Sequence, residues 1–306
     1  MDTCALQLTA ERNRRRLVEV VYHGGAGHIG GDLSCLNVMT ALYNRVMNVS
    51  PEKVKDASRD RFILSKGHCV EALYTVLEQC GFIDAALLNT LGQYGSVLSG
   101  HPTIEVNGIE VNSGALGHGL SIGVGMAIAA RMKGELWHTY VMMGDGEQGE
   151  GSIYEAAMAG GHYHLDNLVA VIDRNHLQIS GNTEDVMAIE DIRQRWTAFG
   201  WDVKEMNGDE MQSIVETFDS QIIYARSVGT LDISDNIFID SKSYAPLFPG
   251  QPVIDVQFCG DVTIKDNDFS KWKPDAEISI HDCVKVLNDS DLPITDKPNP
   301  YRERNW

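Results

Sequence analysis

The chain has 306 residues and a formal net charge of −18, and this acidic balance argues against a nucleic-acid partner, whose binding needs clustered lysine and arginine. The sequence holds no apolar stretch long enough to cross a membrane and no signal-peptide pattern, so we expect no membrane association. Its six cysteines form no CxxC pair, and we expect a reduced, cytoplasmic protein whose cysteines bind no zinc.

Segments with helical and strand-like spacing alternate along the first two thirds of the chain. The predicted helices cover residues 9–23, 32–47, 70–80, 120–132 and 150–159, and the predicted strands cover residues 61–65, 141–143 and 168–172. This alternation indicates an α/β fold, with a parallel sheet that is covered by helices on both faces. Ligands of such sheets bind at the carboxyl ends of the strands.

A glycine-rich segment, Gly25-Ala-Gly27-His-Ile-Gly30, separates the first two predicted helices. It matches the GxGxxG pattern of dinucleotide-binding proteins, but that pattern requires a preceding strand and an acidic strand end about twenty residues later. The sequence provides neither feature, so we do not expect a nicotinamide cofactor.

Three histidines lie in loops that contain glycine or lysine: His28, His68 and His101. Their spacing lacks the i,i+4 pairing of a zinc site. A loop histidine is usually a hydrogen-bonded surface residue, but histidine also donates to carbonyl oxygens and moves protons near neutral pH. Three of them in comparable loops therefore mark a candidate catalytic region.

Polar residues follow two of the predicted strands. Gly144-Asp145-Gly146 ends one strand, and Asp173-Arg-Asn175 ends the next. A carboxylate and an amide at neighbouring strand ends offer hard oxygen ligands to Mg²⁺ or Ca²⁺. The glycines beside Asp145 leave room for a diphosphate, and the N-terminus of the predicted helix 150–159 favours an anion at the same point.

The run GDGEQGEGSIYEAAMAGGHYHLDNLVAVIDRNHLQISGNTED, from Gly144 to Asp185, resembles the diphosphate-binding half of a thiamine diphosphate enzyme. It is similar in particular to transketolase, in the split form whose N-terminal section is a separate chain. The resemblance extends from about residue 10 to about residue 217. It implies thiamine diphosphate as cofactor, Mg²⁺ as its metal with Ca²⁺ or Mn²⁺ as alternatives, and transfer of a two-carbon ketol unit between sugar phosphates.

The resemblance also implies roles for individual residues. His28 and His101 would hydrogen-bond the donor ketose near its reacting carbons, and His68 would lie close to the cofactor diphosphate. The cofactor would further contact Gly114, Leu116, Gly144, Asp145, Gly146, Glu147 and Asn175. The metal would be held by Asp145, Asn175 and the backbone carbonyl of Leu177.

Glu150 belongs to the catalytic set that the resemblance implies. With Glu155, it matches acidic residues that meet their counterparts across the subunit interface of the family. Both carboxylates would also favour the positive end of the predicted helix 150–159 without any such role. The two interpretations are compatible.

The family also needs a glutamate from a second, pyrimidine-binding domain, and the sequence shows no second sheet domain of that kind. The resemblance therefore implies a partner, the C-terminal transketolase subunit, in a homo- or hetero-oligomer. We expect this chain to be inactive alone.

The pattern changes after residue 218. Two segments, Leu231-Asp-Ile-Ser-Asp-Asn-Ile-Phe238 and Val262-Thr-Ile-Lys-Asp-Asn-Asp-Phe269, are near repeats about thirty residues apart. Their apolar alternation predicts stacked short strands, and residues 221–285 resemble rungs of a right-handed parallel β-helix, as in polysaccharide-active enzymes. We expect three parts: residues 1–218, an all-β segment at 219–290 and a tail at 291–306.

Three alternatives to a working transketolase subunit stay open. The chain would be a carbohydrate-active β-helix fragment with a passenger, a non-catalytic chimeric product joined near residue 219, or a divergent transketolase with a genuine insertion. The small number of rungs argues against an independent solenoid, because each rung buries its core only against its neighbours.

Overall fold

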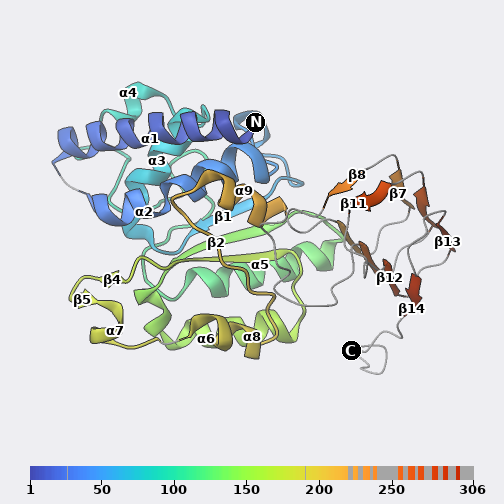
Figure 1. Ribbon diagram of the computed structural model, residues 1–306. Helices are drawn as coiled ribbons and strands as arrows, with labels where there is room; N and C mark the ends of the chain where they lie inside the picture. Colours follow the sequence, from blue (N-terminus) through green and yellow to red (C-terminus); the bar gives the residue numbers. More distant parts are fainter. Residues whose placement is uncertain are drawn as a thin grey trace. The chain divides into compact units, whose positions relative to one another are not determined.

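The computed structural model describes residues 1–25, 27–189 and 191–219 and, beyond residue 219, the short strands named below. The chain forms two compact units, Met1–Phe218 and Asp219–Trp306. Figure 1 shows both units, and each is described here by itself.

A three-stranded parallel sheet with the order β1-β2-β3 lies at the centre of the first unit. Strand β1 (Arg61–Leu64) pairs with β2 (Thr139–Gly144), which pairs with β3 (Leu168–Asp173). Leu64 lies opposite Met142, and Gly144 lies opposite Asp173. Since all strands run in one direction, their carboxyl ends meet at one edge, as the sequence predicts.

Helices cover both faces of this sheet (Figure 1). The alternating side chains of the strands divide between two cores. One core joins Phe62, Leu64, Tyr140 and Met142 to helices α1 (Thr3–Gly24), α2 (Ile29–Ala41) and α3 (Val70–Gln79). The other joins Ile63, Val141 and Met143 to α5 (Gly119–Lys133) and α6 (Gly151–His162). The predicted α/β fold with helices on both faces is thereby confirmed.

The remaining elements of the first unit are short. They are a π-helix at Leu42–Val46, 3-10 helices at Pro51–Lys53, Gly67–Cys69 and Gly146–Gly149, helices α4 (Ala85–Leu88), α7 (Thr183–Val186), α8 (Ile192–Ala198) and α9 (Met211–Asp219), and the hairpin of β4 (Leu177–Gln178) and β5 (Gly181–Asn182). Helix α9 belongs to the first core, because Met211, Ile214 and Val215 are buried there. Across the described residues, no helix has the length and apolarity needed to cross a membrane.

Every strand pairing described in the second unit is parallel. Its sheets have the orders β14-β12-β9-β6, β13-β10-β7 and β11-β8. The strands are β6 (Ile223–Arg226), β7 (Thr230–Ser234), β8 (Ile237–Ile239), β9 (Ile254–Gln257), β10 (Asp261–Lys265), β11 (Asp268–Lys271), β12 (Ile278–His281), β13 (Lys285–Asn288) and β14 (Ile294–Asp296).

The predicted near repeats of the second unit pair with each other. Leu231 lies opposite Val262, and Ile233 lies opposite Ile264, so the prediction of stacked short strands is confirmed at this point. Strand β14 falls within the predicted tail, because Ile294–Asp296 pairs with β12. The Asp-Asn turns between the repeated strands and residues 297–306 lie outside the described residues. The likeness to polysaccharide-active β-helix enzymes stays a prediction.

Candidate cofactor site

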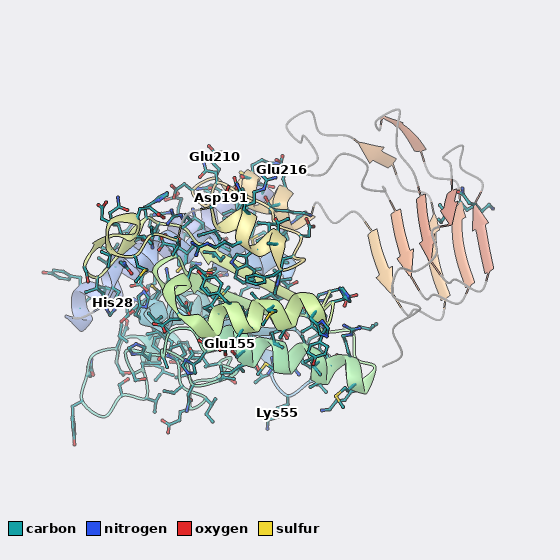
Figure 2. All side chains as sticks on the ribbon, turned by 90° about the horizontal axis from the view of Figure 1, so that it is seen from below. His28, Lys55, Glu155, Asp191, Glu210 and Glu216 are labelled. Atoms are coloured by element: carbon teal, nitrogen blue, oxygen red, sulfur yellow. The ribbon has the colours of Figure 1, made fainter. Side chains whose placement is uncertain are left out.

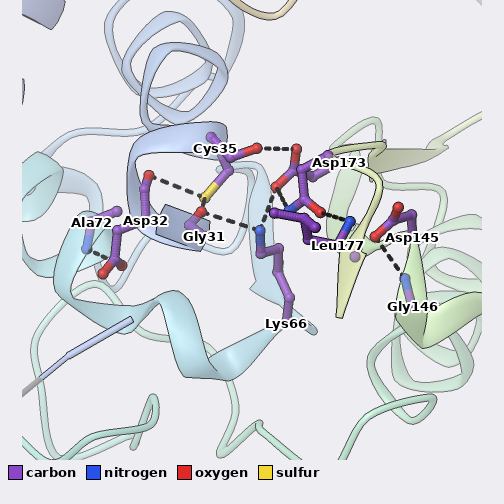
Figure 3. Close-up of polar contacts among 12 residues, drawn as sticks. Gly31, Asp32, Cys35, Lys66, Ala72, Asp145, Gly146, Asp173 and Leu177 are labelled. Atoms are coloured by element: carbon purple, nitrogen blue, oxygen red, sulfur yellow. Dashed lines mark hydrogen bonds and ion pairs between the residues drawn. The ribbon is translucent and has the colours of Figure 1, made fainter. Parts of the chain in front are cut away.

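The candidate site lies where the three strands of the first unit end. Ser65 and Lys66 directly follow β1, Asp145 follows β2, and Asp173 closes β3. Asp145 is 1% exposed, and Lys66 is 1% exposed. The sheet therefore gathers charged groups, separated by up to 107 positions in the chain, at one buried edge (Figure 3).

The Asp145 carboxylate is the centre of a hydrogen-bond network. Its Oδ1 accepts from the Gly146 N–H at 2.7 Å. Its Oδ2 accepts from the His176 N–H at 2.9 Å and from Thr183 Oγ1 at 2.9 Å. The Arg174 guanidinium adds an ion pair at 3.2 Å, and it also pairs with Glu184. Asp145 thus holds the loop after β3 against the end of β2.

The other two predicted metal ligands, Asn175 and Leu177, lie in that same loop, and the Asn175 side chain bonds to groups other than Asp145. Asn175 Oδ1 accepts from the Leu177 N–H at 3.0 Å, and its Nδ2 donates to Asp173 Oδ2 at 3.3 Å (Figure 3). The Asn175 amide is therefore bonded to Asp173, whereas Asp145 is bonded to Arg174. No group of three His, Cys, Asp or Glu suited to a metal occurs among the residues described.

The donor set still has the chemistry of a magnesium site. A carboxylate, an amide oxygen and a backbone carbonyl are hard oxygen ligands, and Mg²⁺ commonly needs only one carboxylate when phosphates and water complete its shell. The Arg174 guanidinium already stands beside Asp145 as a positive charge. A metal ion that binds the same oxygen of Asp145 would compete with this guanidinium.

A buried donor beside Gly146 fits a diphosphate. Among the described side chains, Gln178 Nε2 is buried and has no hydrogen-bond partner. A Cβ at Gly146 would lie 2.9 Å from Gln178 Oε1, so only glycine lets this side chain approach the backbone so closely. A buried donor without an acceptor costs free energy, and a diphosphate oxygen would satisfy it. The residues present therefore fit a diphosphate group.

Lys66 is a member of the site that the sequence reasoning missed. Its ammonium group pairs with Asp173 and donates to the Gly31 carbonyl at 3.2 Å (Figure 3). Ser34 donates to the other oxygen of Asp173 at 2.5 Å. The only signal in the sequence was a lysine directly after a predicted strand, and such a lysine is usually exposed.

The Glu147 carboxylate faces into the protein. It accepts hydrogen bonds from the Gly117 N–H at 2.8 Å, the Gly144 N–H at 3.1 Å and the Ser65 hydroxyl. Burial raises the pKa of Glu147, and these donors oppose that shift. Its oxygens are therefore engaged by Gly144, Gly117 and Ser65, and the predicted direct contact of Glu147 with the cofactor stays a prediction. Glu147 joins the diphosphate side of the predicted site to the Gly114–Leu116 side.

The three predicted histidines come together. The rings of His28 and His68 lie edge to face, with 5.3 Å between their centroids. Burial lowers the pKa of His68 to about 4, and the charges of Lys66, His28 and His101 act in the same direction. The imidazole of His68 is therefore neutral near pH 7, with one N–H to donate and one nitrogen to accept.

Gly114 lies directly against His101. Its φ of +126° is in the region that favours glycine, and a Cβ there would collide with the His101 ring. In the same loop, the Leu116 carbonyl lies 3.0 Å from His118 Nδ1. The predicted contacts of the cofactor ring and one predicted substrate histidine thus share one loop cluster.

Glu150 and Glu155 lie on the exposed side of the first turns of α6. Figure 2 labels Glu155 on this helix, and it labels His28 at the turn between α1 and α2. A Cβ at Gly117 would lie 2.7 Å from Glu150 Cβ, so Glu150 packs beside the Gly114–Gly117 loop. Both glutamates are accessible to another chain.

Comparisons with known proteins indicate the family of this chain. The family described as "Transketolase, thiamine diphosphate binding domain" matches residues 7–228. The chain belongs to the transketolase family. The resemblance that the sequence showed over residues 10–217 is confirmed.

Relatives and solved structures give the extent of the match. The chain is 69% identical over 220 residues to a protein of Phocaeicola vulgatus named as one subunit of apulose-4-phosphate transketolase, covering 72% of this chain and 78% of the relative. It is 41% identical over 215 residues to the 6-deoxy-6-sulfo-D-fructose transketolase subunit SqwG of Clostridium sp., covering 69% and 78%. Transketolase from Campylobacter jejuni superposes with a TM-score of 0.68 at 28% identity, covering 72% of this chain and 36% of that chain.

These coverages show what the chain shares with each relative. It spans about three quarters of the relatives that are named as transketolase subunits, but only about a third of the solved transketolase. The shared part is the thiamine diphosphate-binding domain. The family match ends at residue 228, so it does not account for the later strands of the second unit.

Proposed function

We propose that this chain is the thiamine diphosphate-binding subunit of a two-chain transketolase, which transfers a two-carbon ketol unit between sugar phosphates. The observation that carries the proposal is the 69% identity to a relative named as one subunit of such an enzyme. The strand-end cluster of Asp145, Asp173 and Lys66, with the unsatisfied Gln178 donor beside it, supports a site for a charged, phosphorylated ligand.

The name of that relative makes apulose 4-phosphate the first sugar phosphate to assay. A second relative named for apulose 4-phosphate is 42% identical over 217 residues, whereas the relative named for a sulfonated fructose is 41% identical over 215 residues. At 69%, the first identity stands well above both others. A phosphorylated ketose is therefore the better substrate class.

Each residue of the proposed site would contact a different part of the cofactor or the substrate. Thiamine diphosphate, when bound, supplies the carbon nucleophile and stores the two-carbon unit. His28 and His101 would donate hydrogen bonds to the oxygens of the donor ketose, and neutral His68 would donate to a diphosphate oxygen. Gln178 would satisfy its buried Nε2 on the same group.

The metal site would form at the same strand ends. Asp145, Asn175 and the Leu177 carbonyl would hold Mg²⁺, with Ca²⁺ or Mn²⁺ as alternatives, once Arg174 leaves Asp145. The released guanidinium is long enough to stay near the site, where it would favour anionic phosphate oxygens. By its hydrogen bonds to both backbone N–H groups, Glu147 would keep Gly144 and Gly117 at a fixed separation while the metal and cofactor bind.

The partner would be a C-terminal, pyrimidine-binding subunit that contributes the activating glutamate. Relatives whose names make them single subunits of a transketolase support a separate second chain. The exposed Glu150 and Glu155 are candidates for the contact with that chain. The four cysteines that the structure describes are unpaired, which supports the proposed cytoplasmic setting.

Calorimetric titration of thiamine diphosphate with Mg²⁺ into the purified chain tests this proposal. We expect binding that Asp145→Ala abolishes and that Asp185→Asn, a change at an exposed aspartate outside the site, leaves intact. Absence of binding by a chain with a native circular dichroism spectrum would contradict the proposal. That result would favour a non-catalytic chimeric product.

A further inference from the structure

The first turn of α2 and the start of α3 lie side by side and carry two of the predicted histidines. His28 is the N-cap residue of α2, and His68 lies in the 3-10 helix Gly67–Cys69 that leads into α3. Helices α2 and α3 pack against each other, and the centroids of the two histidine rings are 5.3 Å apart. A contact that fixes these two helix starts relative to each other therefore also fixes the separation of the rings.

Asp32 connects the two helix starts. It lies one turn after His28, and its N–H donates to the His28 carbonyl at 3.0 Å. Its Oδ1 accepts from the Ala72 N–H at 3.1 Å (Figure 3). Ala72 is the third residue of α3, where backbone N–H groups lack an acceptor within the helix, and the N-cap residue Cys69 provides no side-chain hydrogen bond. A side chain of α2 thus caps α3.

Contacts of Gly31 hold the same two helix starts together. The Gly31 carbonyl accepts from Lys66 Nζ at 3.2 Å (Figure 3). A Cβ at Gly31 would lie 2.7 Å from Cys69 Sγ, so only glycine lets α2 approach this turn so closely. The bond from Asp32 to Ala72 is therefore made across an interface that is already in close contact, and it adds a directional link to that packing.

Water cannot replace the bond between Asp32 and Ala72. Both residues are 0% exposed, and a buried N–H that loses its acceptor costs free energy. Among the residues described, Asp32 Oδ2 is a buried oxygen without a hydrogen bond. The carboxyl thus holds α3 through one oxygen, and the oxygen of an amide group could take its place.

We propose that Asp32 is a positioning residue, which caps α3 from α2 and thereby fixes the distance between His28 and His68. The positioning stands on the contacts of Asp32, Gly31 and Ala72. Its consequence for the reaction rests on the proposed function, in which His28 hydrogen-bonds the donor ketose and His68 lies at the cofactor diphosphate. The separation of the two rings then sets how far the ketose lies from the cofactor.

Nuclear magnetic resonance of the full chain, with carbon-13 in its histidines, tests the positioning without an assay of activity. In wild type we expect a nuclear Overhauser contact between the ring protons of His28 and His68. This contact should be lost in Asp32→Ala, because the two helix starts are no longer linked. It should be kept in Asp32→Asn, because the asparagine Oδ1 can accept from the Ala72 N–H.

A matched control separates positioning from a general loss of stability. Thr40, on the same helix, is also 0% exposed, and its hydroxyl accepts from Asn13 Nδ2 on α1 at 3.1 Å. Thr40→Val removes that buried bond and should keep the contact between the histidine rings. If Asp32→Ala does not fold, Asp32→Ser takes its place, because the serine hydroxyl is too short to reach the Ala72 N–H.

Absence of the ring contact in wild type, its survival in Asp32→Ala, or its loss in Asp32→Asn or Thr40→Val would overturn the positioning role. The consequence for substrate is measured on the enzyme assembled with its partner chain. There, Asp32→Ala should raise KM for the ketose several-fold more than kcat falls, and Asp32→Asn should restore KM. If the ring contact is lost and KM does not move, the role given to His28 is wrong while the positioning by Asp32 stands.

Discussion

Asp145 and Asp173 end adjacent strands, and each meets a cation of the chain itself. Lys66 is held in place by Asp173 and a carbonyl, and both partners are largely buried. Arg174 is 30% exposed at its side chain and divides its guanidinium between Asp145 and Glu184. The difference in burial makes Arg174 the cation that can leave, because partly exposed pairs contribute little free energy.

Replacing this cation should change how the chain binds a metal. Without cofactor, we expect Arg174→Met to tighten Mg²⁺ binding about 5-fold, because an ion pair worth about 1 kcal/mol no longer competes for Asp145. Calorimetric titration with MgCl₂ alone measures this. Arg193→Met, at an arginine of α8, serves as the control, and equal affinities in all three proteins would contradict the competition.

The pH dependence of stability should carry the signature of Asp32. Its pKa lies near 7 in the folded chain against an ordinary value of 3.8, so the folded chain binds the proton more tightly than the unfolded chain. The resulting stabilisation is complete below pH 4 and is lost as pH rises through 7. Each unit of difference in pKa corresponds to about 1.4 kcal/mol.

Urea unfolding of wild type and Asp32→Asn at pH 5 and pH 8 measures this effect. We expect the variant to gain stability relative to wild type as the pH rises, because asparagine cannot lose a proton. If the difference in free energy of unfolding between the two proteins is the same at both pH values, Asp32 does not hold a proton in the folded chain.

At the scale of elements, glycines and one glutamate fix the positions of the site's loops relative to one another. Glu147 connects the end of β2, the residue after β1 and the start of α5, where Ser65 also accepts from the Gly119 N–H at 3.1 Å. We expect Glu147→Ala to lower the free energy of unfolding by about 3 kcal/mol, because three buried donors lose their acceptor. Chemical unfolding measures the loss, and a change below about 1 kcal/mol would contradict this role.

A second element-scale test concerns the loop that contacts His101. Gly114→Ala should cost about 1–3 kcal/mol, because alanine is strained at a φ of +126° and collides with the His101 ring. Gly125→Ala is a matched control, since a Cβ there meets nothing within 4 Å. Calorimetric melting should show a lower Tm only for the change at position 114.

The elements themselves were largely predictable from the sequence. Helix α5 spans Gly119–Lys133 against a prediction of 120–132, and β3 ends at Asp173 where polar residues begin. Strand ends near Asp145 and Asp173 follow from topology, because parallel strands share one edge. The direction of Asn175 and the ion pair of Lys66 do not follow, because they depend on contacts between side chains far apart in the chain.

At the scale of the whole molecule, the family match and the division into units do not coincide. The match ends at residue 228, whereas the first unit ends at Phe218. Sequence indicated a change of pattern at residue 218 but also a tail from residue 291, where β14 lies. Strand β14 has three residues, too few for its strand pattern to be recognised in the sequence. The division into residues 1–218, 219–290 and 291–306 remains our proposal.

Truncation tests the independence of the first unit. A chain of residues 1–220 should keep the Tm of its transketolase domain. A chain of residues 1–208 should unfold, because it loses Met211, Ile214 and Val215 from the core at about 2–5 kcal/mol for each large side chain, against a total of about 5–15 kcal/mol. Failure of the 1–220 chain to fold would show that the later strands complete the first unit.

The guanidinium beside Asp145 has a consequence for ion selectivity. A monovalent ion that displaced Arg174 would exchange one positive charge for another and would leave the net charge around Asp145 as it was. A divalent ion adds a charge in the same exchange, and the surplus can attract the phosphates of an incoming ligand. Potassium and sodium, though far more abundant in a cell, should therefore gain no advantage at this carboxylate.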